Sequence, residues 1–395
     1  MLIPLTNEPR DYSWGSPSLI ADLEGRAPSG RPEAEVWFGD HPGDPAVIPD
    51  GRTLAEWLSD EAARTGSPER LPFLLKLLAA ASALSIQAHP SRTQAEAGFA
   101  HEEEAGIPRD AAERTYRDAN HKPELIVAVS PRFRALAGLR DLDATRRLAA
   151  ALGPGGAALA ERLEADASPR DLVRWALSPH SAAEVRGVLD AARSASSDEF
   201  AAELELARAL HEGFPGDPGI LVALLMNLVT LREGEGMFVP AGVLHAYLEG
   251  LGVELMAASD NVLRGGLTPK HIDVAELLAV LDDRPGLPPI VRPRPEGPGR
   301  VRYDVPVADF SLVRVDVGAG VEVRHPLDGA AIVLATAGGV RVEGSAGAAP
   351  GASGGLVDLA PGAAAFASPD ERALVFSGTG TVFVASQGRE QSSPA

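Results

Sequence analysis

One short strand-like stretch decides how this 395-residue chain is understood: Leu84-Ser85-Ile86-Gln87-Ala88-His89-Pro90. Side chains alternate along a β-strand, so Gln87 and His89 lie on one face and Ile86 and Ala88 on the other. A glutamine oxygen and an imidazole nitrogen that point the same way can supply half of a metal site. A Gln-x-His pair by itself is more often only the polar face of a strand, so a metal site needs further ligands elsewhere in the chain.

Two other stretches supply candidates for the missing ligands. Residues 120–124 (Asn-His-Lys-Pro-Glu) precede an apolar run, and residues 240–247 follow the strand-like residues 237–239. The combined set has two nitrogen and two oxygen donors, which suits zinc or a similar divalent ion: Gln87, His89, Glu124 and His245. Two alternatives stay open, because Glu124 could instead pair with Lys122 and His245 could be a hydrogen-bonded turn residue.

The composition fits a protein of several domains without disulfides. At 395 residues the chain is longer than one core usually holds, and its hydrophobic content of 45% is ordinary for a globular protein. The formal net charge of -19 argues against nonspecific nucleic-acid binding, which needs a basic surface. The chain has no cysteine, which excludes thiolate metal sites and cysteine nucleophiles.

The N-terminus and the hydropathy pattern predict a cytoplasmic protein. Residues 1–8 lack the basic segment and apolar core of a signal peptide. The longest apolar run, residues 220–231, contains Asn227 and is too short to span a bilayer. We therefore expect no membrane partner and no nucleic-acid partner, and a monomer that acts on a small molecule.

The pattern along the chain predicts a mainly β protein with an all-helical insertion. Helix-forming residues and N-terminal caps recur from about Asp141, a proline-rich linker follows Arg284, and short strands between glycine-rich turns follow Val301. Such strands are typical of a sandwich or jelly roll. The predicted units are a β domain in two parts at 1–140 and 232–290, a helical insertion at 141–231, a C-terminal barrel without a metal site at 300–387 and a disordered tail at 388–395.

A weak internal echo links the two β parts. Residues 233–240 are similar to residues 360–367. When Gly234 is aligned with Gly362 without gaps, His245 falls opposite Ala373. The C-terminal barrel is therefore a candidate second copy that lacks the metal ligand, although glycine-turn-strand chemistry alone could produce the same similarity.

Three motifs closely resemble those of the type I mannose-6-phosphate isomerase family, and they occur in that family's order: residues 85–90, 120–124 and 257–270. Residues 12–15 and 34–42 are similar to the family's N-terminal pattern. The resemblance implies a cupin-type catalytic barrel, an inserted helical domain and a second cupin-type barrel. It also implies one zinc ion on the four candidate ligands and a catalytic arginine at Arg264. The chain departs from the family pattern at Ser16, Leu244 and Gly265, and none of these changes removes a functional group.

The resemblance implies interconversion of mannose 6-phosphate and fructose 6-phosphate, in which a proton moves between neighbouring carbons through an enediol. The developing enediolate oxygen can be stabilised by a Lewis-acid metal and by a fixed arginine. We expect Arg264 to bind the enediolate or the phosphate, although it could instead only pair with Asp260. Glu254 is our candidate proton carrier, with a metal-bound water as the competitor, and Lys122 is a third candidate catalytic residue.

The candidate substrate-binding residues are Lys270, Ser85, Tyr247 and Lys76. Lys76 stands in an apolar run, where it either extends to solvent or points into the site. Two other functions stay open. One is a cupin metal-dependent oxygenase, which needs redox iron. The other is a non-catalytic sugar-binding cupin, which predicts ligand binding without turnover.

Overall fold

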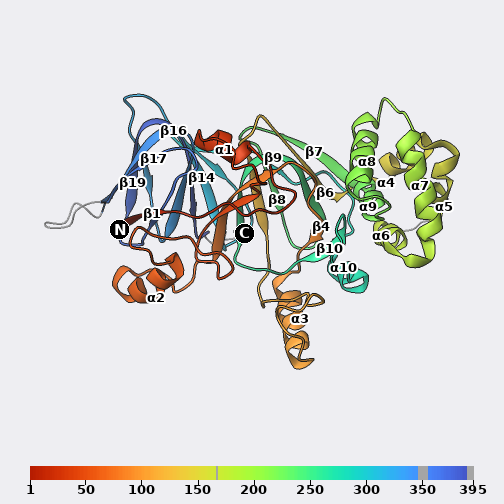
Figure 1. Ribbon diagram of the computed structural model, residues 1–395, viewed down its shortest axis with the longest axis horizontal. Helices are drawn as coiled ribbons and strands as arrows, with labels where there is room; N and C mark the ends of the chain where they lie inside the picture. The colour runs from red at the N-terminus through yellow and green to blue at the C-terminus, as the bar shows by residue number, and fades with distance from the viewer. Residues whose placement is uncertain (166–167, 346–354, 389–395) are drawn as a thin grey trace, which may run out of the picture.

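Two antiparallel β-sheets and a separate group of helices make up the molecule (Figure 1). The computed structural model describes residues 1–165, 168–345 and 355–388. This architecture confirms the predicted mainly β fold with helices inserted. The domain limits at 140, 231, 290 and 300 stay predictions, and the predicted disordered tail lies outside the described residues except for Gly388.

The first sheet has ten strands and is organised by the long strand β9. This strand pairs with four others, β3, β4, β5 and β6, and so brings distant parts of the chain together. The ten strands are β2 (Glu35–Phe38), β3 (Phe73–Ala80), β4 (Ile86–Ala88), β5 (Glu124–Ala128), β6 (Arg132–Leu139), β7 (Met226–Arg232), β8 (Gly236–Val239), β9 (His245–Ala257), β10 (Leu263–Gly266) and β11 (Ile290–Val291).

The second sheet has nine strands, and eight of them come from the C-terminal part of the chain. The ninth is β1, where Leu2 pairs with Ala367 and so ties the start of the chain into the second sheet. The nine strands are β1 (Leu2–Leu5), β12 (Arg294–Gly297), β13 (Arg300–Tyr303), β14 (Ser311–Val317), β15 (Val323–Pro326), β16 (Ala331–Gly344), β17 (Leu356–Leu359), β18 (Ala364–Ala367) and β19 (Ala373–Ser386).

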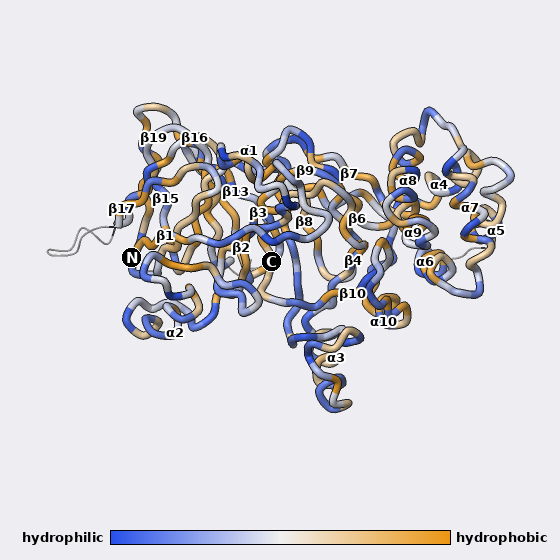
Figure 2. Tube along the Cα trace, viewed as in Figure 1, coloured by the Kyte–Doolittle hydropathy of each residue, from blue (hydrophilic) through white to orange (hydrophobic). Residues whose placement is uncertain are grey.

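A shared apolar layer holds the two sheets against each other. Leu77 and Val253 of the first sheet belong to the same buried cluster as Leu312 and Ile332 of the second. Figure 2 shows that hydrophobic residues recur along the strands of both sheets. The opposite face of the second sheet buries a separate cluster of valine, leucine, alanine and phenylalanine. The corresponding face of the first sheet is apolar only in part, which leaves room there for polar side chains.

The helical group spans Leu142 to Leu225 and contacts β4, β6 and β10 through one apolar cluster. Its members are α4 (Leu142–Ala151), α5 (Ala157–Glu164), α6 (Pro169–Leu177), α7 (Ala182–Ser194), α8 (Ala201–Gly213) and α9 (Gly219–Leu225). Four further helices lie outside this group: α1 (Leu19–Glu24), α2 (Leu54–Thr65), α3 (Arg92–Glu104) and α10 (Val274–Val280).

The prediction that helix continues to Leu231 is wrong in its last six residues. The helices end at Leu225, and β7 begins at Met226 and pairs with β6. An apolar run such as 220–231 does not show by periodicity where a buried helix ends and a strand begins. Residues 226–231 form a strand because they pair with β6, which lies far away in the sequence.

The internal echo extends to the backbone. Gly234 and Gly362 both adopt positive φ, 79° and 85°, a conformation that glycine adopts without steric cost. Each glycine precedes a four-residue strand, β8 or β18. The next strands, β9 and β19, begin at His245 and Ala373, the two residues that the gapless alignment places opposite each other.

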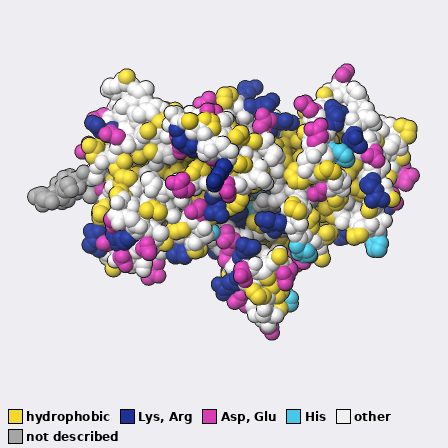
Figure 3. Space-filling view, in the orientation of Figure 1, with side chains coloured by type: hydrophobic (Ala, Val, Ile, Leu, Met, Phe, Trp, Pro, Cys, Tyr) yellow, Lys and Arg dark blue, Asp and Glu magenta, His cyan; other side chains and the backbone are white. Residues whose placement is uncertain are grey.

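The charge of the surface and the lengths of the helices bear on what a nucleic-acid-binding protein or a membrane protein requires. Basic and acidic side chains are interspersed over the described part of the face seen in Figure 3. Among the described residues, no helix combines the length and the apolar character that crossing a membrane requires.

His325, on β15, makes the stability of the second sheet sensitive to acid. Its side chain is buried, and burial lowers the pKa of the imidazole to about 4; Arg300 and Arg302 act in the same direction and Glu296 opposes them. In the unfolded chain the pKa is ordinary, about 6.5, so protons bind the unfolded state more tightly. Stability that is fully present above about pH 6.5 is then lost as the pH falls toward 4, by up to about 3 kcal/mol.

We expect His325→Gln to lose less stability than the wild type between about pH 7 and about pH 4.5, measured by urea unfolding. His180→Gln, in an exposed turn of the helical group, is the control and should follow the wild type. Equal losses in all three proteins would contradict the assignment.

Candidate active site

Strand register places three predicted site residues in one row. Arg264 on β10 is the cross-strand partner of Gln87 on β4, and Gln87 is the partner of His245, the first residue of β9. Directly opposed residues share a sheet face and lie within side-chain contact of one another. An arginine, an amide and an imidazole therefore stand side by side on one face of the first sheet.

A second row on this sheet contains a buried ion cluster. Lys76 on β3 is the cross-strand partner of Glu254 on β9. Its Nζ lies 3.0 Å from Glu254 Oε2 and 3.6 Å from Glu35 Oε1, and its side chain is 8% exposed. Of the two alternatives left open for Lys76, the structure shows the one that points into the site.

A compact group of potential metal ligands is formed by His89, Glu124 and His245. Nε2 of His89 lies 3.1 Å from Glu124 Oε1, and Nε2 of His245 lies 3.2 Å from Glu124 Oε2. All three residues are buried, and one donor atom from each lies within 4.8 Å of the others. His89 follows β4 directly, Glu124 begins β5 and His245 begins β9, so three strand ends converge here.

The donor geometry of this group fits a divalent ion. Ligands at about 2.0–2.2 Å from a tetrahedral zinc are roughly 3.3 Å apart, close to the two separations just given. His89 Nε2 is buried and, although it lies 3.1 Å from Glu124 Oε1, it forms no hydrogen bond with the described residues. The Nδ1 atom of the same ring lies 2.7 Å from the backbone oxygen of Asn261. Donation of the Nδ1 proton to that oxygen leaves the Nε2 lone pair free for a metal.

Gln87, the fourth predicted ligand, lines the same cavity. Its side-chain Nε2 donates to Ser85 Oγ at 3.1 Å, which leaves the amide oxygen available for another contact. Tyr247 also faces the group, and its hydroxyl donates to Glu124 Oε2 at 3.3 Å. Lys122 Nζ lies 3.0 Å from Glu124 Oε1. The alternative that Glu124 pairs with Lys122 is thus observed together with the histidine contacts and does not replace them.

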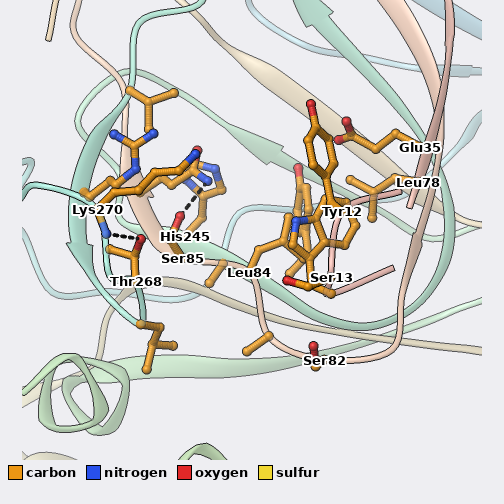
Figure 4. A pocket seen from close by; sticks show the side chains of 18 of the residues that line it. Tyr12, Ser13, Glu35, Leu78, Ser82, Leu84, Ser85, His245, Thr268 and Lys270 are labelled. Atoms are coloured by element: carbon orange, nitrogen blue, oxygen red, sulfur yellow. Dashed lines mark hydrogen bonds between the residues drawn. The ribbon is translucent and has the colours of Figure 1, made fainter. Parts of the chain in front are cut away.

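These rows face a cavity of about 490 Å³. Figure 4 shows Lys270 and Thr268 at one side, Tyr12 and Glu35 at the other, and His245 between them. Ten of the eleven residues predicted from sequence to be functional line this cavity, all except His89: Lys76, Ser85, Gln87, Lys122, Glu124, His245, Tyr247, Glu254, Arg264 and Lys270. The chain contains three lysines, and all three line this cavity.

The buried charges shift one another's pKa values. Burial lowers the pKa of His89 to about 4, and Lys122 acts in the same direction, so the ring is neutral at physiological pH, as a metal ligand must be. Burial alone would raise the pKa of Glu124, but Lys122 and His89 hold it well below its usual range. Burial raises the pKa of Glu254; Lys76 opposes this and Glu124 reinforces it. The site therefore holds one carboxylate that is firmly ionised and one that binds a proton more readily.

Cations gather at the end of the cavity formed by β10. Burial lowers the pKa of Arg264, and the charge of Arg117 adds to this effect. Burial also lowers the pKa of Lys270, with Arg264 and Arg117 acting in the same direction. Mutual repulsion of this kind favours binding of an anion between the cations. Asp260, the alternative partner of Arg264, instead lies 3.2 Å from His41 Nε2.

Sequence reasoning missed part of the lining, notably Tyr12, Trp14, Glu35, Phe214 and Thr268. Glu35 had a local signal, because a carboxylate in the apolar strand 35–39 is as unusual as Lys76 in its own strand. Phe214 follows α8, so the helical group contributes to the cavity wall. No local signal marks Phe214, because its place depends on how the helices pack.

The comparisons with known proteins agree with this geometry. Residues 2–142 match the family described as phosphomannose isomerase type I, catalytic domain. The mannose-6-phosphate isomerase of Escherichia coli is 35% identical over 392 residues, covering 95% of this chain and 97% of that protein. The Rattus norvegicus enzyme is 34% identical over 388 residues, covering 86% and 88%. A solved structure of mannose 6-phosphate isomerase from Salmonella typhimurium, bound to fructose 6-phosphate and zinc, has a TM-score of 0.85 at 33% identity and covers 98% of this chain and 100% of its own. This chain belongs to the type I phosphomannose isomerase family.

Proposed function

We propose that this protein interconverts mannose 6-phosphate and fructose 6-phosphate. The observation that carries the proposal is the buried group His89, Glu124 and His245. Glu124 and His245 line the same cavity as the cations Arg264 and Lys270. Relatives that match most of the chain are named for this reaction, and one solved relative holds fructose 6-phosphate and zinc. The reaction moves a proton from C2 to C1 of the open-chain sugar, while a hydroxyl proton moves between the two oxygens.

Four residues would hold one zinc ion: Gln87, His89, Glu124 and His245. When bound, the ion supplies a Lewis acid that stabilises negative charge on the sugar oxygens. With a single carboxylate among the ligands, the site keeps a formal charge of about +1. The neutral Gln87 preserves that charge, whereas a second carboxylate would cancel it.

Arg264 would stabilise the enediolate oxygen. Its position beside Gln87 in the sheet supports this role, because it faces the same cavity as the ligand group. A guanidinium offers a fixed fork of donors for an oxyanion or a phosphate. Lys270, at the exposed end of the same segment, would bind the phosphate as a point charge, and Ser85 and Tyr247 would bind sugar hydroxyls.

Glu254 would carry the proton between C2 and C1. It is buried and lines the cavity, and its raised pKa suits a group that both takes and returns a proton. Lys76 would hold the Glu254 carboxylate in place through their contact at 3.0 Å. Lys122, beside Glu124, would move the hydroxyl proton between the substrate oxygens.

We further propose that the protein works as a monomer in the cytoplasm. Few large apolar side chains of the described residues are exposed: Met1, Tyr12, Leu287, Ile290, Val321 and Leu356. The absence of cysteine from the sequence is compatible with a reducing compartment.

The direct test is a coupled assay of mannose 6-phosphate conversion before chelation, after chelation and after zinc is restored. We expect activity to disappear with the metal and to return with zinc. Redox iron that restores activity with consumption of dioxygen would support the oxygenase instead. Tight sugar binding by folded, metal-loaded protein without turnover would support the sugar-binding alternative.

A further inference from the structure

One asparagine joins the two loops that carry the site. Asn261 lies between β9 and β10 and is 0% exposed. Its backbone oxygen accepts from Nδ1 of His89 at 2.7 Å. Its side chain reaches in the other direction, to residues 117–120, the loop that precedes Lys122 and Glu124.

The side-chain amide of Asn261 is fully used. Oδ1 accepts from the backbone N–H groups of Arg117 at 2.7 Å and Asp118 at 3.2 Å. Nδ2 donates to the backbone oxygens of Asp118 and Asn120, both at 2.8 Å. An asparagine amide offers two donors and two acceptor positions, and all four are satisfied here. A buried group with this arrangement specifies one loop geometry, because each lost bond leaves a buried polar atom unpaired.

The loops are also joined around Asn261. Ser259 Oγ donates to Asp118 Oδ1 at 2.9 Å, and the Asp260 backbone N–H donates to Asp118 Oδ2 at 2.7 Å. Asn120 Nδ2 donates to the Ala258 oxygen at 3.0 Å. Residues 117–120 and 258–261 therefore form one unit that leads into β5 on one side and into β10 on the other.

We propose that Asn261 is a positioning residue for both halves of the site. Its backbone oxygen sets the orientation of the His89 ring, and its amide fixes the loop that presents Lys122 and Glu124. Arg264 follows three residues later on the same segment, so metal ligands and substrate cations are placed relative to each other through this one side chain. The inference rests on the proposed function, but it concerns how the site is assembled and not which reaction it performs.

Asn261→Asp is the sharpest test, because it keeps the shape of the side chain and removes both donors. A carboxylate there would face the oxygens of Asp118 and Asn120, so the loop must shift. Loss of a partner that orients a metal ligand typically costs about 10- to 100-fold in metal affinity. We expect the zinc dissociation constant to rise by that factor, and the visible absorption bands of the cobalt-substituted protein to change in position and intensity.

The matched control is Asn7→Asp. Asn7 Nδ2 also donates to backbone oxygens, those of Trp37 at 3.0 Å and Asp44 at 3.3 Å, and neither residue belongs to the ligand group or pairs with a member of it. Its substitution should lower the melting temperature and leave zinc affinity and the cobalt spectrum unchanged. If Asn261→Asp loses stability with unchanged zinc affinity and spectrum, its role is merely structural and the inference is overturned.

A milder variant covers the case in which Asn261→Asp does not fold. Ser259→Ala keeps Asn261 and removes the hydroxyl that bonds Asp118 Oδ1, the Asn120 oxygen and the Asn261 backbone N–H. We expect it to weaken zinc binding by about threefold or more; unchanged affinity would overturn the inference. Wild-type protein that binds zinc tightly but turns over no mannose 6-phosphate would contradict the proposed function and leave the metal-affinity test of Asn261 valid.

Discussion

Arg264→Ala is expected to lower kcat by about a hundred- to a thousandfold, the usual effect of removing one preorganised donor from a developing oxyanion. The loss should fall on kcat more than on KM, because the charge on the enediolate exists only after proton abstraction. Zinc affinity should change little, because Arg264 pairs with Gln87 through the strand backbone and is not itself one of the metal ligands. Steady-state kinetics and metal titration on the same preparation measure both quantities.

Two further variants sharpen this result. Arg264→Lys keeps the charge and loses the fork, so its kcat should lie between those of wild type and alanine variant. Arg132→Ala removes an exposed arginine that pairs with Glu249, and it should behave like the wild type. If Arg264→Ala raises KM with kcat unchanged, the residue binds phosphate alone and does not stabilise the enediolate.

Lys76→Met is expected to lower the free energy of unfolding by about 3–5 kcal/mol, because it leaves buried carboxylates without their cation. Glu254 and Glu35 are both buried and would have to bind protons or admit water. Activity should fall as well, since a Glu254 that is held protonated cannot take a proton from the sugar. Urea unfolding at neutral pH and steady-state kinetics are the two measurements.

The double variant Lys76→Met with Glu254→Gln separates charge from packing. If the loss arises from unpaired charge, adding Glu254→Gln should restore part of the stability and none of the activity. Lys270→Met is the control: this lysine is exposed, so stability should hold while KM rises. Stability equal to wild type in Lys76→Met would show that the buried ion cluster is not structurally important.

Local sequence patterns predict which residue types form the site, but they do not predict how those residues are arranged in space. Alternation along residues 84–90 and the polar motif at 120–124 identify ligand types without any knowledge of the fold. The pairing of Arg264 with Gln87 cannot be read in this way, because register joins residues far apart in the chain. The same limit explains the misplaced helix end at Leu225, where β6 decides that the next residues form a strand.

The internal echo predicts the positions of turns and strands but not the side chains that fill each sheet. Equivalent turns at Gly234 and Gly362 were visible as a repeat, and the equivalent strand starts at His245 and Ala373 agree with it. The sequence repeat does not show which side chains fill the inner face of each sheet, because that depends on packing. The inner face of the second sheet is filled by apolar side chains, whereas the first keeps a charged cavity.

The distribution of lysine has a practical consequence for chemical labelling. All but three of the 36 basic residues are arginines, and the three lysines line the cavity. A reagent that acylates or reductively methylates side-chain amines therefore meets lysines only at this cavity, where Lys76 and Lys122 are buried and Lys270 is exposed. Isotopic methyl labelling of the lysines would place its NMR probes in the cavity, and coupling through an exposed lysine side chain would attach the protein to a support at Lys270, on the cavity wall.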